Sequence, residues 1–317
     1  MSNEQIAYLN FLIEKMVFYS VIIMPTIGIF TNILNIAICM RKKLRTSLLG
    51  YYNFLISTFN ILLFIDSSIV YLPPAVYQKD LSNSMDFLCW SLSFISRVLP
   101  QMAIWINVFL MIDRFLSVSF PGRFRFKNDR KKLSWIMFSL FIALVILNIS
   151  NVFYKITIQT NEIKVCSAIN LIILIRNMEI ALFGVILPTL FHIIFSIILI
   201  LKLYQTRRNL NLNMTVKRDR RFTLIVLALN VLFCLTELPY SIVTLYLGIK
   251  GIVPSYPMSQ SLSYSQALMN FIFYVTFVFS GFNFNSLLLV NLMFNKIFQK
   301  EIRKILFGLK KMSQEIW

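Results

Sequence analysis

Seven long segments of this chain contain almost no charged side chains, a pattern that few folds can accommodate. They lie at about residues 16–40, 48–72, 88–112, 133–154, 180–201, 222–249 and 266–290. A helix needs about 20 consecutive apolar residues to cross a bilayer, and each segment reaches that length. Hydrophobic residues make up 58% of the chain and charged residues 14%, against about 45–50% and about 25% in soluble domains. The sequence therefore predicts an all-α membrane protein, a single seven-transmembrane helix bundle, and excludes a soluble globular fold.

The basic residues are concentrated on one side of these segments. If the amino terminus lies outside, the inner loops and the tail at 296–317 hold 24 of the 31 Lys and Arg residues, and the outer segments hold 6. Lys and Arg are retained on the cytoplasmic side of a membrane. We therefore expect a multi-pass protein of the plasma membrane with an extracellular amino terminus and a cytoplasmic carboxyl terminus. The net charge of +18 then reflects topology and contact with anionic membrane lipid, and it does not indicate nucleic-acid binding.

The inner end of the third segment carries the most specific motif. Asp113, Arg114 and Phe115 are followed, after five more residues, by Pro121. This motif resembles the Asp-Arg-Tyr-x-x-x-x-x-Pro signature of rhodopsin-like, class A G-protein-coupled receptors, with Phe115 in the Tyr position. The resemblance implies coupling to a heterotrimeric G protein, an extracellular peptide or small-molecule ligand, and no cofactor. It also implies a short amphipathic eighth helix after the last span.

Other positions extend the resemblance. Phe233 and Pro239 match the sixth-helix pattern Phe-x-x-Cys-Trp-x-Pro, in which Glu237 takes the Trp position. The family links two outer cysteines, here Cys89 and Cys166, and the extracellular space permits disulfides. The seventh segment lacks Asn-Pro-x-x-Tyr. The sequence is therefore similar to the divergent receptors of large invertebrate peptide and chemoreceptor families.

The second segment contains another departure from the family pattern. Asn60 takes the position of the family's Asp in this segment. This change removes the charge on which the family's sodium pocket depends, and a lone amide is a poor ligand for a hard cation.

Charged residues inside membrane spans are costly and mark functional sites by default. Asp66, Arg97 and Glu237 are the three here. We predict Ser96, Arg97 and Glu237 as ligand-binding residues, with Glu237 either contacting ligand, pairing with Arg97, or forming a protonated helix–helix hydrogen bond. Ser96 occupies the place where amine receptors of the family carry Asp, so a monoamine is disfavoured. The seventh segment has no lysine for a Schiff base, so retinal is excluded, and a peptide or small polar or anionic ligand remains.

The inner end of the sixth segment contains a candidate switch residue. Asp219 lies twenty residues before Pro239, about 30 Å along a helix, which places it level with Arg114. An Arg–carboxylate pair can be bidentate and would hold the third and sixth helices together in an inactive state. The alternative is a solvated charge among basic neighbours. The predicted switch and coupling residues are Asp113, Arg114, Phe115, Pro121, Asp219, Phe233 and Pro239.

Three other classes compete with a receptor. A transporter or channel usually shows more intramembrane polar residues or inverted repeats. A seven-span hydrolase needs several histidines for zinc, whereas His192 is the only histidine. We therefore predict no enzyme, no catalytic residue and no metal site. A non-signalling orphan seven-helix protein stays open as the remaining alternative.

Overall fold

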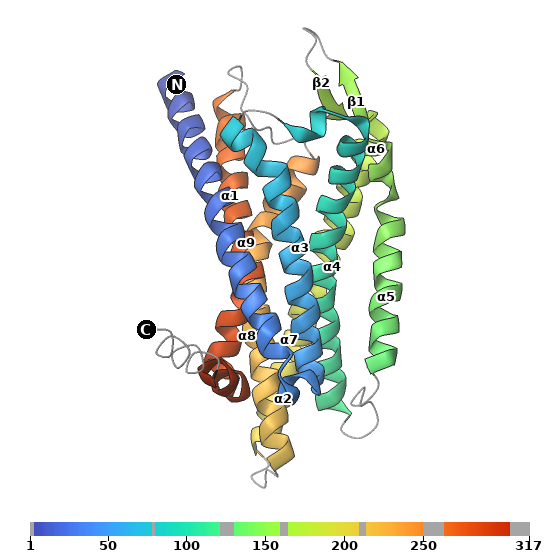
Figure 1. Ribbon diagram of the computed structural model, residues 1–317, viewed down its shortest axis with the longest axis vertical. Coiled ribbons are helices and arrows are strands. Elements are labelled where there is room, and N and C mark those ends of the chain that lie inside the picture. Colours follow the sequence, from blue (N-terminus) through green and yellow to red (C-terminus); the bar gives the residue numbers. More distant parts are fainter. Residues whose placement is uncertain are drawn as a thin grey trace, which may run out of the picture.

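The computed structural model describes residues 3–77, 80–120, 130–158, 164–208, 214–249 and 263–304. These residues form an elongated bundle of seven helical columns that run along the long axis of the molecule (Figure 1). The columns are α1 (Asn3–Cys39), α3 (Leu48–Tyr77), α4 (Asp86–Ser119), α5 (Arg130–Leu147), the continuous run α6 (Asn170–Glu179), η3 (Ile180–Ile186) and α7 (Leu187–Arg208), then α8 (Met214–Ile249) and α9 (Tyr264–Phe294). The observed fold is the expected all-α seven-helix bundle.

Six of these columns are long and apolar enough to cross a membrane. The fourth column, α5, differs from the prediction of 133–154, because its helix has 18 residues and ends at Leu147. At 1.5 Å per residue it is about 27 Å long, just short of a bilayer core of about 30 Å. Beyond it, Asn148 donates to the Gln101 side chain at 2.6 Å, and the chain continues as the 3₁₀ helix η2 (Ile149–Phe153). The helix ends at the polar stretch Asn148-Ile149-Ser150-Asn151. The hydropathy pattern alone predicted that the span continues through it.

Several columns begin earlier than their apolar segments, the first and the fifth by the largest margin. The first starts at Asn3, well before residue 16, and the fifth starts at Asn170, ten residues before the predicted span. Gaps between charges locate the apolar part of a helix, but a helix continues through polar residues wherever its backbone stays hydrogen-bonded. The fifth helix therefore carries Arg176, which the sequence pattern placed in an outer loop.

The fifth column contains a π-helical segment directly before Pro188. Proline has no N–H to donate to the preceding turn, and here the backbone N–H of Leu187 bonds the carbonyl of Leu182, five residues back. Such π-bulges are frequent at functional sites in helices. The wider turn spans Ile180–Ile186, and it faces the cavity described below through Ile180 and Gly184.

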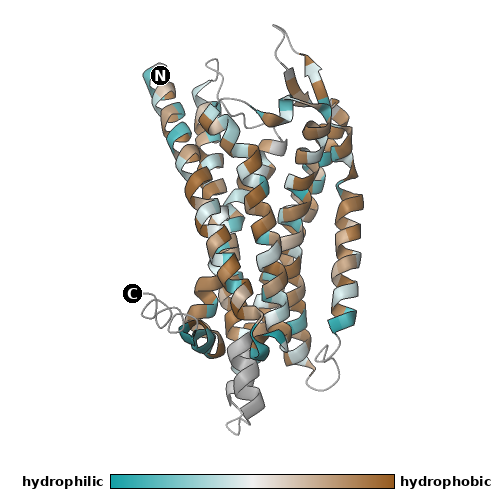
Figure 2. Ribbon diagram, viewed as in Figure 1, coloured by the Kyte–Doolittle hydropathy of each residue, from teal (hydrophilic) through white to brown (hydrophobic). Residues whose placement is uncertain are grey.

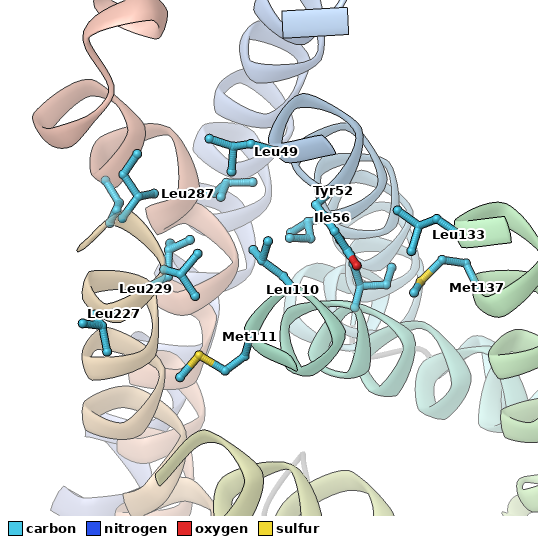
Figure 3. Close-up of a cluster of buried hydrophobic side chains, with 14 of the residues drawn as sticks. Leu49, Tyr52, Ile56, Leu110, Met111, Leu133, Met137, Leu227, Leu229 and Leu287 are labelled. Atoms are coloured by element: carbon cyan, nitrogen blue, oxygen red, sulfur yellow. The ribbon is translucent and has the colours of Figure 1, made fainter. Parts of the chain in front are cut away.

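Hydrophobic residues make up most of the length of the helices (Figure 2). Inside, a large cluster joins helices α3, α4, α5, α8 and α9, including Tyr52, Leu110, Leu133 and Leu287 (Figure 3). Outside, large apolar residues remain highly exposed, among them Phe30 at 68% and Trp135 at 68%. Extended apolar exposure of this kind marks a surface that meets lipid or another apolar phase. The bundle is accordingly a multi-pass membrane protein.

Buried asparagines connect the first, second and seventh helices. Asn60 donates to the Asn32 side chain at 3.3 Å, and both residues donate to the backbone carbonyl of Phe284. Closer to the inner end, Asn53 donates to Asn291 at 3.2 Å. Buried polar groups are stable only when they are hydrogen-bonded, so these bonds fix the register of α1, α3 and α9.

Two short helical segments lie at the inner end. The first is α2 (Lys42–Arg45), between α1 and α3. The second covers residues 296–304, directly after Asn295, where the sequence predicts an amphipathic eighth helix. Its Phe298 is fully buried against Ile38 and Leu44, whereas the description of the chain stops at residue 304. The amphipathic eighth helix therefore stays a prediction.

Candidate functional site

A β-hairpin lies at the end of the bundle at which the chain starts (Figure 1). Strands β1 (Lys155–Ile158) and β2 (Lys164–Ser167) pair antiparallel. A disulfide joins Cys166 of β2 to Cys89 of α4, as the sequence predicts. Two hydrogen bonds support it: Ile156 N–H donates to Asp86 at 2.8 Å, and Cys166 N–H donates to Asn83 at 2.7 Å. The hairpin is thereby fixed to the outer end of α4.

Below the hairpin, two cavities lie one above the other between the helices. The outer chamber has a volume of about 300 Å³ and the inner chamber about 180 Å³. Five residues line both chambers: Tyr71, Arg97, Ile180, Tyr240 and Phe277. These shared side chains lie between the two chambers. The chambers therefore form one site, and its neck is at Arg97.

The inner chamber contains all three predicted ligand-binding residues. Ser96 and Arg97 come from α4, and Glu237 comes from α8, 140 positions further along the chain. Asp66 of α3 lines the same chamber and is 8% exposed. The Ser96 hydroxyl is buried and lies within hydrogen-bonding reach of the Asp66 carboxyl. The fold thus gathers the three ionisable residues of the membrane spans into one place.

Glu237 is held by the seventh helix rather than by Arg97. Its Oε1 accepts a hydrogen bond from the Ser280 hydroxyl at 2.8 Å and one from Asn283 at 3.4 Å. Within the described part of the chain no ion pair joins Glu237 to Arg97. These contacts favour the helix–helix hydrogen bond over the pairing with Arg97, while the position of Glu237 in the chamber wall leaves its second oxygen available to a ligand.

Arg176 is a charged wall residue that the sequence reasoning missed. It lines the outer chamber together with Arg97, and its guanidinium lies over the Tyr154 ring, 4.8 Å from the ring centre. Counting residues between spans assigned it to an outer loop, because no apolar pattern distinguishes a helix extension from a loop. A signal existed in the spacing: Arg176 follows Cys166 by ten residues, so the disulfide keeps it near α4.

The predicted switch residues lie at the opposite end of the bundle. Asp113 and Arg114 are buried, with 3% and 7% exposure, and Arg114 pairs with the Asp113 carboxylate on the same helix. The Phe115 ring packs 5.1 Å from the Phe195 ring of α7. Asp219 lies in helix α8, but its side chain is outside the described residues, and so is Pro121. The proposed pairing of Asp219 with Arg114 therefore stays a prediction.

A buried polar cluster lies between the cavity and this inner end. His192 of α7 bonds Asn230 of α8 at 2.8 Å, and the His192 and Phe233 rings are 4.2 Å apart. A small space of about 20 Å³ borders His192, Asn230 and Asn60, enough for about one water. The predicted residue Phe233 thus packs on the contact between the fifth and sixth helices, two turns below Pro239.

A seven-helix bundle with a disulfide-tied hairpin over a central cavity defines a serpentine membrane receptor. The chain matches the family described as serpentine type 7TM GPCR chemoreceptor Srw over residues 19–307, and it therefore belongs to that family. No curated protein matches the sequence. The match confirms the expected divergent, invertebrate-type receptor, and it supports a receptor role rather than an enzymatic one. Membership of the rhodopsin-like class A, which the sequence motifs resemble, stays a prediction.

Proposed function

We propose that this protein is a plasma-membrane receptor that binds an extracellular peptide or small polar or anionic ligand and signals through a heterotrimeric G protein. Its amino terminus is extracellular and its carboxyl terminus cytoplasmic. The main support is the cavity: Ser96, Arg97 and Glu237, predicted from sequence as ligand contacts, line one chamber. The chamber lies toward the hairpin end, and the Asp113–Arg114 pair lies at the other.

The proposed transmission route runs along α4 and α8. Both helices line the chamber and both continue to the inner end, where α4 carries Arg114 and α8 carries Asp219. A ligand that contacts Arg97 and Glu237 differently in two bundle arrangements shifts the balance between them. The G protein then binds the arrangement in which the inner ends have separated.

The test is agonist-stimulated nucleotide exchange. The receptor, purified into lipid nanodiscs, is combined with a panel of heterotrimeric G proteins and a library of peptides and metabolites. We expect at least one compound to accelerate exchange, and Arg114→Ala to abolish the acceleration while ligand binding persists. A response that is unchanged in Arg114→Ala would contradict coupling through this residue.

A further inference from the structure

Two arginines line the outer chamber, and the charge of Asp66 in the adjoining inner chamber acts on one of them, Arg97. Arg97 comes from α4 and Arg176 from α6, and both line the same cavity wall. They are close enough for the charge of one to act on the other. Neither forms a hydrogen bond or ion pair with any residue that the structure describes. Two like charges in a partly enclosed space repel each other more strongly than in water, so the empty chamber favours a negative charge between them.

The acidic residues nearby are already engaged by other donors. Asp80 also lines the outer chamber, but its carboxylate accepts hydrogen bonds from Ser82 N–H at 2.9 Å and from Asn83 at 3.2 Å. Glu179, three residues after Arg176, accepts from the Ser150 hydroxyl at 2.8 Å. Neither carboxylate forms an ion pair with Arg97 or Arg176 in the part of the chain that the structure describes. Asp66, on the inner-chamber side, offsets the charge of Arg97 in part, so Arg176 is the less compensated of the two.

Arg176 is held in place by an aromatic ring. Its guanidinium stacks on Tyr154, the residue directly before strand β1. Its Nε is buried and has no hydrogen-bond partner among the described residues. An Arg side chain stacked in this way retains its planar donor fork, which fits a carboxylate with two parallel hydrogen bonds. The unused donor indicates that the chamber lacks a group that the ligand supplies.

The inner chamber has a different character. Apart from Asp66, Ser96, Arg97, Gln101 and Glu237, its walls are mainly apolar, with Met24, Leu63, Phe64, Val278 and Phe284 among them. The carboxyl groups of Asp66, Asp80 and Glu237 border the combined cavity. They disfavour a second negative charge on the ligand, and they offer acceptors to any uncharged donor on its body.

From this arrangement we infer that the ligand is an organic monoanion, a carboxylate on an apolar body, whose head binds between Arg97 and Arg176. Its body passes the neck formed by Tyr71, Tyr240 and Phe277 and fills the inner chamber beside Ser96 and Glu237. This inference narrows the ligand class of the receptor proposed above and rests on that site being the ligand site.

The experiment measures binding without any G protein. Unfolding temperatures of the full-length receptor in nanodiscs are recorded with linear carboxylates from butanoate to decanoate, and with the matched amides and amines. A compound that binds the folded state raises its stability in proportion to concentration over Kd. We expect the longer carboxylates to stabilise the receptor, and the amides and amines to do so about tenfold more weakly in apparent affinity.

Substitutions at single residues show where the carboxylate binds. Arg97→Gln and Arg176→Gln should each weaken carboxylate binding about tenfold, and the shift on adding ligand is measured against each variant's own unliganded unfolding temperature. Lys155→Gln removes a positive charge from the same end of the molecule. Lys155 is exposed and lines neither chamber, so this matched control should bind like the wild type. An alkyl sulfate and an alkyl phosphate of the same length separate a preference for carboxylate from a general preference for anions.

Each outcome decides the proposal. If no carboxylate stabilises the wild type more than its matched amide, or if stabilisation persists in both arginine variants, the anion site is wrong. If Lys155→Gln weakens carboxylate binding as much as the arginine variants do, the anion site is also wrong, because the weaker binding then reflects only the surface charge. A carboxylate that binds through both arginines but never promotes exchange on any G protein supports the anion site and contradicts the proposed signalling. A neutral agonist that promotes exchange and is unaffected by either arginine variant supports the proposed signalling and contradicts the anion site.

Discussion

The side chain of Asn60 on α3 donates a hydrogen bond to the backbone carbonyl of Phe284 on α9, at 2.9 Å. The same amide also donates to the Asn32 side chain on α1 at 3.3 Å. Asn60 is 1% exposed. One uncharged side chain therefore connects three helices in the position where the resembled receptors carry a carboxylate for sodium.

Replacing Asn60 with Ala should destabilise the bundle by about 1–3 kcal/mol, because the buried Asn32 side-chain oxygen loses its donor and the Phe284 carbonyl loses one of its two. Thermal unfolding of the purified receptor measures the change. Asn107→Ala is a suitable control, since the Asn107 amide bonds only the Ala103 carbonyl of its own helix, at 3.1 Å. A control variant as unstable as Asn60→Ala would show that the loss does not depend on the connection between helices.

The amide at Asn60 also predicts that ligand affinity does not depend on sodium. An amide is a poor ligand for a hard cation, which prefers carboxylate oxygens, so exchanging Na⁺ for K⁺ should leave ligand affinity unchanged in the wild type. Asn60→Asp should create sodium sensitivity, provided the variant still folds. Agonist binding measured in matched sodium and potassium buffers tests this, and a wild-type affinity that responds to sodium would contradict it.

Because the Cys89–Cys166 disulfide needs both cysteines, replacing either one should cause the same defect. Cys89→Ser and Cys166→Ser should each reduce surface expression and ligand response, because the bond ties β2 to α4. Removing a native disulfide commonly costs about 2–5 kcal/mol in a small domain. The double variant should be no worse than either single one, since all three lack the same bond. Normal surface levels in both single variants would refute this role of the bridge.

Glu237 can be tested for charge separately from hydrogen bonding. Glu237→Gln keeps an acceptor for the Ser280 hydroxyl, which donates to Oε1 at 2.8 Å, whereas Glu237→Ala leaves that buried hydroxyl unpaired. We expect the Gln variant to unfold near the wild-type temperature and the Ala variant to lose about 1–3 kcal/mol. If Gln weakens an agonist as much as Ala does, the carboxyl group itself contacts the ligand.

Membrane burial made much of this molecule predictable from sequence. A charged side chain inside an apolar span is costly unless it faces the bundle interior. Arg97 and Glu237 could therefore be assigned to a cavity before the fold was known. Arg176 could not, because helix α6 extends beyond the apolar segment and only the folded backbone shows which way its side chains face. The sequence also could not show that helix α5 ends at Leu147, inside the predicted span, since the hydrogen bond from Asn148 to Gln101 depends on a helix distant in sequence.

The inner ion pair yields the last prediction. Arg114 pairs with Asp113 on its own helix, and both side chains are almost fully buried. Removing one partner of such a pair reduces the compensation of the buried charge that remains, and breaking a buried pair commonly costs about 3–5 kcal/mol. Asp113→Asn should therefore favour bundle arrangements in which Arg114 reaches solvent or the G protein, and raise ligand-independent nucleotide exchange.

Asp219→Asn provides the comparison, because the sequence places this residue level with Arg114 on α8. If Asp219 also holds the arginine, its Asn variant should raise basal exchange by about two- to fivefold, which corresponds to about 0.4–1 kcal/mol, a range typical of exposed pairs. Basal exchange is measured at matched receptor density with one G protein. A rise in Asp113→Asn alone would assign the restraint to the pair within α4, and no rise in either variant would show that Arg114 is not restrained by a carboxylate.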